Sequence, residues 1–468
     1  MGLRKKKRGK ALKGNVTIQN TREKTIKIIW LLAYPIMIGQ LLHTFMMLVD
    51  IWFVSELLGE TVTAAVGAST ALMGVVRVLP FLLSTGAIAL VSQFTGSESP
   101  KDVKDVAKNA LLLSVVIGVV MGIGLYLNIE GILRIFGDSS PEVLAEAVKY
   151  LRLAFISIPF IFFNVTAKAI SEATGDTKNP VIIFLIMNGM NIILDYVFIV
   201  QLNFGIEGAS LATLLAEVLG LILMTVLIGR KVLPFREVLA KGLGLRIKTC
   251  KAILKIGRYS MVQMMVRPIT GLIMMRIVLG LGETPAAALS IGGRLFEFIF
   301  IFLKGLQIAV SVLVGQSLGR GDRQKAFEII RKGLTLAMIN MGVFFLLYVV
   351  LGRYLMMIFT SSEELIQIGV YYLRICYLGV IFVVFPIVLG GAFTGAGDTM
   401  PPMISAIVGN VLVKIPLAVY LGNYTSLEEI GVWIAIALSV VFEAAVIGRW
   451  FKKRGLSGGL RENLGKKQ

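Results

Sequence analysis

The feature that most constrains this chain is a succession of apolar segments, each long enough to cross a lipid bilayer as a helix. A membrane-spanning helix needs about 20 mostly apolar residues. Because 56% of the residues are hydrophobic and only 16% are charged, a water-soluble globular fold is excluded. The sequence therefore predicts an all-α, polytopic membrane protein of about twelve spans, at approximately 26–54, 64–94, 105–127, 144–171, 180–201, 207–229, 252–280, 286–317, 327–350, 366–394, 403–421 and 429–450.

Charged residues alternate in sign between successive loops. The net charge is +19, and the basic residues gather in the amino-terminal tail, the loop around 230–258 and the carboxy-terminal tail. The intervening loops carry mainly Asp and Glu. This is the positive-inside pattern, and it predicts that both termini lie in the cytoplasm, as in a multi-pass protein of the plasma membrane. We expect the basic surface to face anionic lipid headgroups and not nucleic acid.

An internal repeat divides the chain into two halves. The stretch LGETVTAAVG (Leu58–Gly67) recurs as LGETPAAALSIG (Leu281–Gly292), and Gln316 minus Gln93 is the same 223 as Gly282 minus Gly59. Six helices per half give both copies the same orientation, so we expect two six-helix lobes related by a pseudo-two-fold axis along the membrane normal. The predicted organisation is a tail at 1–25, lobes at 26–230 and 251–450, a linker loop at 231–250 and a basic tail at 451–468.

Four polar residues stand out within the apolar segments of the first half. Asp195 lies deep in the fifth span, four residues after Asn191 and therefore on the same helix face. Asp50 and Thr213, in the first and sixth spans, are expected at a similar depth. A carboxylate inside a membrane marks a functional site with a partner to be found. Carboxylate, amide and hydroxyl oxygens suit a small cation such as Na⁺, and two close carboxylates can instead share one proton.

The repeat indicates that this polar set is particular to the first half. In the second half the equivalent positions are all apolar: Ile273, Val413, Leu417 and Ile436. A group that the common fold requires should persist in both copies, so the polar set is predicted to serve function.

Four further residues are accessory candidates. Glu217 lies one turn from Thr213 and either extends the acidic site or forms a solvated wall. His43 either influences proton access to Asp50 or is a packed histidine. Pro35 can kink the first span or be merely tolerated there. Lys414 is interpreted as a counter-charge or gate, or as half of an internal salt bridge.

Taken in order, these features resemble the multidrug and toxic compound extrusion (MATE) family, and specifically its DinF-like branch, in the multidrug/oligosaccharidyl-lipid/polysaccharide flippase superfamily. The resemblance rests on the six-plus-six helices, on GAGDT (Gly395–Thr399) with its echo ATGDT (Ala173–Thr177), and on GIEGASLAT (Gly205–Thr213).

The resemblance implies antiport, in which a small cationic or amphipathic organic compound leaves the cell while Na⁺ or H⁺ enters. It also implies that Asp50, Asn191, Asp195 and Thr213 match the cation site of the amino-terminal lobe. A carboxylate that another bacterial branch carries in the tenth helix is not found at 366–394.

The alternative is a flippase for a lipid-linked saccharide, which the basic residues Arg267, Arg276, Lys304 and Lys414 would support. An enzyme is not expected, because no nucleophile–base set, metal spacing or phosphate loop is present. No cofactor beyond the coupling ion is expected, and the chain is expected to act as a monomer.

Overall fold

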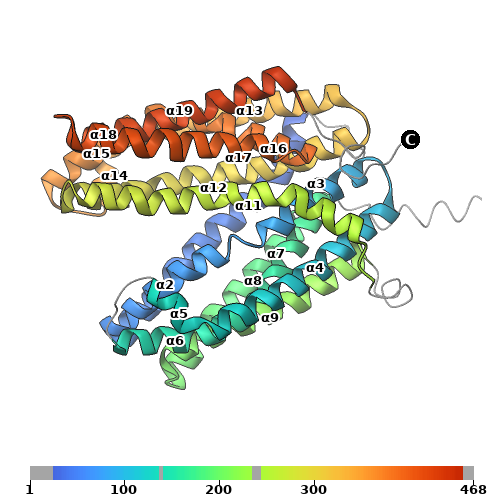
Figure 1. Cartoon of the computed structure of the whole chain (residues 1–468), viewed down its shortest axis with the longest axis horizontal. Coiled ribbons are helices and arrows are strands. Elements are labelled where there is room, and N and C mark those ends of the chain that lie inside the picture. Colours follow the sequence, from blue (N-terminus) through green and yellow to red (C-terminus); the bar gives the residue numbers. More distant parts are fainter. Residues whose placement is uncertain (1–24, 136–140, 234–243, 457–468) are drawn as a thin grey trace, which may run out of the picture. The chain divides into compact units, whose positions relative to one another are not determined.

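The computed structural model describes residues 25–135, 141–233 and 244–456 and, within them, the side chains outside 46–65, 68, 71, 134 and 135. Throughout these described residues the ordered elements are helices, which confirms the predicted all-α class. Within these described residues, eleven helices are long and apolar enough to cross a membrane, or up to twelve if the bent pair Pro141–Ile156 and Ile158–Ala173 is one span. That pair is bent by 46°, and Figure 1 shows the helices of each half running side by side.

The first half of the chain contributes eight elements after the first helix. They are α3 (Phe81–Gly96), α4 (Pro100–Leu127), α5 (Ile129–Ile135), α6 (Pro141–Ile156), α7 (Ile158–Ala173), α8 (Lys178–Asp195), the π-helix η1 (Tyr196–Gln201) and α9 (Gly205–Lys231). Proline stands in the first turn of α4 and of α7, where its missing N–H leaves no helical hydrogen bond unmade.

The second half combines long α-helices with short α-helices and short π- or 3-10-helical segments. They are α11 (Ile247–Leu279), α12 (Glu283–Gly319), α13 (Arg323–Phe345), η2 (Leu346–Val350), α14 (Gly352–Met357), α15 (Glu363–Val380), η3 (Ile381–Val383), α16 (Val384–Ala396), α17 (Met400–Ile407), η4 (Val408–Lys414), α18 (Ile415–Asn423) and α19 (Glu428–Arg454). Three of these segments, η2, η3 and η4, lie between helices of a single candidate span or at its end.

The first helix differs from the sequence prediction. A loop was expected near 55–63, yet α2 (Thr25–Val76) continues through that stretch and ends only before a turn at Arg77–Pro80. The stretch holds a single glycine and no proline, and its Leu and Glu residues favour a helix. Pro80 stands at the N-cap of α3. The helix is therefore interrupted at this proline and not at the polar stretch 55–63.

The chain divides into two compact units, and each unit includes the start of one helix that belongs, by sequence, to the other half. Unit 1 contains Ile38–Gly257, and unit 2 contains the beginning of α2 up to Met37 together with the chain from Arg258 onward. In unit 2, a Cβ on Gly305 of α12 would lie 2.9 Å from the Ala33 carbonyl oxygen. In unit 1, Gly257 of α11 packs in the same way against the Leu82 carbonyl of α3. Gly305 of α12 and Leu82 of α3 are equivalent positions of the repeat, because their numbers differ by 223. The crossing of α12 with α2 in unit 2 therefore corresponds to the crossing of α3 with α11 in unit 1.

The repeat is also visible in the turns. Gly175 and Gly397, from the two GDT motifs, both adopt positive φ (92° and 79°), where glycine carries no steric penalty. The backbone N–H groups of Asp176 and Asp398 then donate to carbonyls five residues earlier, at 3.1 and 3.0 Å. Identical capping at equivalent positions supports a common origin for the two halves.

An aromatic cluster fills the interior of unit 2. Tyr372 meets the fully buried Trp433 edge-on at 4.7 Å, and Phe296 lies 5.7 Å from Tyr372 and 5.5 Å from Tyr348 between ring centroids. The buried Tyr348 hydroxyl donates to the Leu295 carbonyl at 2.6 Å, so its polar end is satisfied. This cluster fixes α12, α15 and α19 against one another.

Candidate functional site

Asp195 is completely buried at the carboxyl end of α8. It lies inside the candidate span Lys178–Gln201, and the π-helix η1 begins at the next residue. π-helical turns are rare in proteins, and those that occur often lie at functional sites. A fully buried carboxyl group inside a membrane helix costs free energy that packing alone does not explain.

Contacts between α8–η1 and α9 fix the level of Thr213. Met187 packs against Gly220, and Phe198 packs against Gly208, so the two helices run in opposite directions. Asp195 lies three residues before Phe198 and therefore at about the level of Leu211, within one turn of Thr213. The Thr213 hydroxyl donates to the Ala209 carbonyl at 3.2 Å, which leaves its oxygen lone pairs available to accept or to coordinate.

Asn191 brings an amide to the same helix face as Asp195, one turn earlier. Its Nδ2 atom is buried and has no hydrogen-bond partner among the described residues. Rotation of the carboxamide exchanges nitrogen and oxygen, so the group can present either a donor or an acceptor at that position. A buried polar atom of this kind calls for an explanation, and a bound cation held by the amide oxygen is one.

Of the four predicted site residues, three are placed by the structure on two adjacent helices. Asn191 and Asp195 stand on α8 and Thr213 stands on α9, at neighbouring levels. The backbone at Asp50 belongs to α2, while its side chain lies outside the described side chains. A carboxylate, an amide and a hydroxyl in this arrangement offer oxygen ligands to Na⁺, or a carboxylate that can take up a proton. The described residues hold no group of three His, Cys, Asp or Glu side chains for a metal ion.

Glu217 has a partner that the sequence analysis missed. Asn164 on α7 donates to Glu217 Oε2 at 2.8 Å and to the Glu217 carbonyl oxygen at 2.9 Å. Arg77 is close enough to Glu217 to interact electrostatically. Asn164 is fully buried, and its place directly after the apolar stretch 158–163 of α7 is the signal that could have revealed it.

The other accessory candidates are divided between the two units. His43 is half-buried in the part of α2 that belongs to unit 1, whereas Pro35 is buried in the part that belongs to unit 2. Lys414, at the end of η4 in unit 2, donates to the Asn410 side-chain oxygen at 2.5 Å. Lys414 therefore belongs to a second polar group, separate from the Asp195 group of unit 1.

Comparison with known proteins agrees with this architecture. The sequence matches the MatE family over residues 35–197 and 260–420, one match in each half of the chain. It is 26% identical over 448 residues to the "Probable multidrug resistance protein NorM" of Thermotoga maritima, a match that covers 93% of this chain and 95% of that protein. It is 25% identical over 426 residues to the "Probable multidrug resistance protein YoeA" of Bacillus subtilis, which covers 88% of this chain and 91% of that protein.

A solved structure has the same fold. The "Crystal structure of MATE in the straight conformation" superposes with a TM-score of 0.85 at 23% identity, and the match covers 95% of this chain and 97% of that one. The two family matches together span more than half of the sequence, and one falls within each predicted lobe. This chain is a member of the MatE family of membrane transport proteins.

Proposed function

We propose that this protein is a secondary active antiporter that exports organic compounds in exchange for Na⁺ or H⁺. Its multidrug-resistance relatives support the transport of organic compounds. The observation that carries the coupling is Asp195, a fully buried carboxyl group at the α8–η1 junction with Asn191 one turn away. No nucleotide-binding motif was found in the sequence, so an ion gradient is the proposed energy source.

Ion binding can drive export only if the ion binds the two conformations with different affinity. Binding of Na⁺ or of a proton neutralises the charge of Asp195. It thereby removes electrostatic repulsion between the carboxylates of Asp195 and Asp50. Helices α2, α8 and α9 can then draw closer, which favours the conformation that releases substrate. By reciprocity, bound substrate weakens ion affinity by the same factor.

Flux in vesicles tests the coupling directly. Purified protein is reconstituted, and uptake of a fluorescent organic cation is followed with the Na⁺ gradient and the pH gradient imposed separately. We expect one gradient to drive transport and Asp195→Asn to abolish it, because the amide neither binds a proton nor carries the charge that holds Na⁺. The matched control is Asp102→Asn, the same change in the first turn of α4. Equal transport by wild type and Asp195→Asn would refute the proposal.

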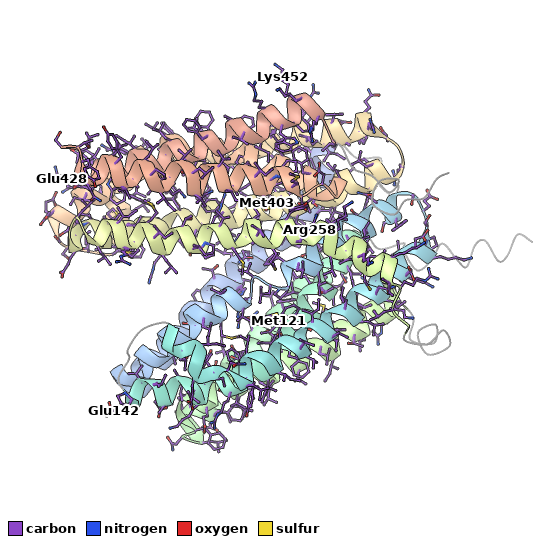
Figure 2. All side chains as sticks on the ribbon, viewed as in Figure 1. Met121, Glu142, Arg258, Met403, Glu428 and Lys452 are labelled. Carbon is purple, nitrogen blue, oxygen red and sulfur yellow. The ribbon has the colours of Figure 1, made fainter. Side chains whose placement is uncertain are left out.

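We also propose that both termini face the cytoplasm and that the protein acts as a plasma-membrane monomer. The charges of α19 support the orientation, because Glu428 and Glu429 stand in its first turn and Lys452, Lys453 and Arg454 in its last. Figure 2 shows Glu428 and Lys452 at opposite ends of that helix. A cysteine introduced at Lys452 should react with a membrane-impermeant maleimide only after the cell membrane is opened. Labelling in intact cells would contradict the orientation.

A flippase for a lipid-linked saccharide is the second candidate, and one observation favours it. Arg267 and Lys414, two cationic residues of the membrane spans, share one polar group in unit 2, whereas Arg276 and Lys304 are exposed elsewhere. Movement of a labelled lipid-linked saccharide between leaflets, measured in the same vesicles, separates the two functions.

A further inference from the structure

Four polar side chains from three helices meet inside unit 2. Asn410 on η4 donates to Glu443 Oε2 of α19 at 3.0 Å, and Lys414 donates to Asn410 Oδ1 at 2.5 Å. From the other side, Arg267 Nη2 of α11 lies 3.8 Å from Glu443 Oε1. Neither the predicted cation site nor the family comparison accounts for this group, which we call the Arg267–Lys414 cluster.

The cluster carries more positive than negative charge. Arg267 and Lys414 supply two cations, and Glu443 supplies one carboxylate, whose side chain is only 3% exposed. Arg267 lies within ion-pair distance of that carboxylate. Lys414 instead donates to the amide oxygen of Asn410 and interacts with the Glu443 carboxylate at longer range. Arg267 and Lys414 therefore share the single carboxylate of Glu443, which leaves the cluster with a net positive charge.

Depth makes that excess charge significant. Arg267, Lys414 and Glu443 each lie several turns from the ends of the candidate spans Ile247–Leu279, Met400–Asn423 and Glu428–Arg454. Lipid tails cannot solvate an ammonium or a guanidinium group, so intramembrane charges pair or face a polar space. The Arg267 side chain is nevertheless 44% exposed, which leaves it open to a ligand. Its guanidinium also stands 5.1 Å from the centre of the Phe300 ring, which offers an adjoining apolar surface.

The local backbone is shaped to bring the cluster together. The π-helix η4 carries both Asn410 and Lys414, and such segments are often found at functional sites. Gly409 lets η4 approach α19 closely, because a Cβ there would lie 2.8 Å from both the Glu443 Cβ and the Ser439 carbonyl oxygen. A larger residue at 409 would push Asn410 away from Glu443.

We propose that Arg267 and Lys414 form a subsite for an anionic group, a phosphate or carboxylate, carried by an amphipathic organic substrate. The guanidinium and the ammonium bind the anion by charge-assisted hydrogen bonds, and Phe300 packs against the apolar part beside it. Glu443 and Asn410 position the two cations. The inference rests on the proposed transport function and adds to it the charge of a substrate group that unit 2 recognises.

Equilibrium binding of two matched amphiphiles tests the subsite. The full chain is placed in nanodiscs of phosphatidylcholine, and binding of radiolabelled dodecyl phosphate is compared with binding of dodecyltrimethylammonium. Lys414→Gln keeps a donor for Asn410 but removes the charge, so we expect dodecyl phosphate affinity to fall about tenfold or more, with dodecyltrimethylammonium unaffected. Lys452→Gln, the same change at the exposed end of α19, is the control and should leave both affinities unchanged.

A second variant predicts a change of opposite sign, which misfolding cannot produce. Glu443→Gln keeps an acceptor for Asn410 and removes the only carboxylate of the cluster, so dodecyl phosphate should bind more tightly. Unchanged affinity in Lys414→Gln, or weaker binding in Glu443→Gln, would overturn the proposal and leave the cluster a structural one.

The source of the anion is decided in a third arm, with phosphatidylglycerol added to the nanodiscs. If phosphatidylglycerol competes with dodecyl phosphate in the wild type and not in Lys414→Gln, the subsite binds a lipid headgroup. No competition, with dodecyl phosphate still bound, assigns it to a free amphipathic anion, and either result supports the subsite. If the wild-type protein binds dodecyl phosphate as expected but shows no gradient-driven flux, the antiport proposal is refuted and the subsite proposal stands.

Discussion

The Asn164 side chain reaches across from α7 to hold Glu217 of α9, donating to its carboxylate at 2.8 Å and to its backbone carbonyl at 2.9 Å. The contact lies where Gly220 leaves room, since a Cβ on Gly220 would come 2.7 Å from Asn164 Nδ2. One amide group therefore fixes both the position of α9 against α7 and the direction of an acidic side chain near Thr213.

We expect Asn164→Ala to destabilise the protein by about 1–3 kcal/mol, because it leaves a polar group and a carboxylate without their donor in an apolar surrounding. The loss is measurable as a lower midpoint of thermal unfolding in detergent. Asn188→Ala is the control, since within the described part of the chain Asn188 donates only to Phe184 of its own helix, at 2.6 Å. Equal losses in the two variants would show that the bridge between helices adds nothing.

Helix crossing in unit 1 should be sensitive to a single methyl group at Gly257. A Cβ there would lie 3.0 Å from the Leu82 Cα and closer still to its carbonyl, so Gly257→Ala must shift backbone and should cost about 1–3 kcal/mol. Gly271 of the same helix has open space around it, and Gly271→Ala should be neutral or stabilise by up to about 1 kcal/mol. Unfolding followed by fluorescence compares the two. An unaffected Gly257→Ala protein would argue against the close crossing.

The asymmetry of the repeat gives a prediction for the second half. Leu417, the equivalent of Asp195, is half-buried, and Leu417→Ala should lower stability by about 1–2 kcal/mol through lost packing. Transport per folded molecule, and its dependence on Na⁺ or pH, should stay as in the wild type. A changed ion dependence at equal expression would mean that the second half takes part in coupling.

Pro35 provides a test of how the first helix takes part. Alanine there restores the backbone N–H that proline lacks and allows a regular helix. We expect Pro35→Ala to reduce ion-driven export while leaving equilibrium binding of Na⁺ or protons to the protein unchanged. The two quantities are measured separately, by flux in vesicles and by radioactive Na⁺ binding or proton uptake in detergent. Full export by the variant would show that bending at residue 35 is not needed.

The spans were predictable because their apolar length is dictated by the bilayer and does not depend on tertiary contacts. The fifth and sixth spans, at 180–201 and 207–229, match Lys178–Gln201 and Gly205–Lys231 closely. The continuation of α2 through 55–63 was missed, because polarity suggested a loop where helix-forming residues prevail. Part of the site was equally accessible, since Asn191 and Asp195 share a face by spacing alone.

Contacts between helices distant in sequence were not predictable in the same way. Asn164 and Glu217 are joined only because α7 and α9 pack together, and Asn410 meets Glu443 because Gly409 allows η4 to approach α19. The spacing rules used on the sequence did not predict the π-helices that follow Asp195 and contain Lys414. One signal was available in advance: Asn410 stands four residues before Lys414.

The placement of the start of α2 in unit 2 has a consequence for the order of synthesis. A ribosome delivers residues 25–37 to the membrane first, but the groove at Gly305 that receives Ala33 and Met37 emerges only with α12. The leading segment must therefore wait in the bilayer through the insertion of six further candidate spans before it reaches its final neighbours. A nascent chain halted before α12 would leave that segment exposed to membrane chaperones and proteases, so quality control can act on this protein before the second half is complete.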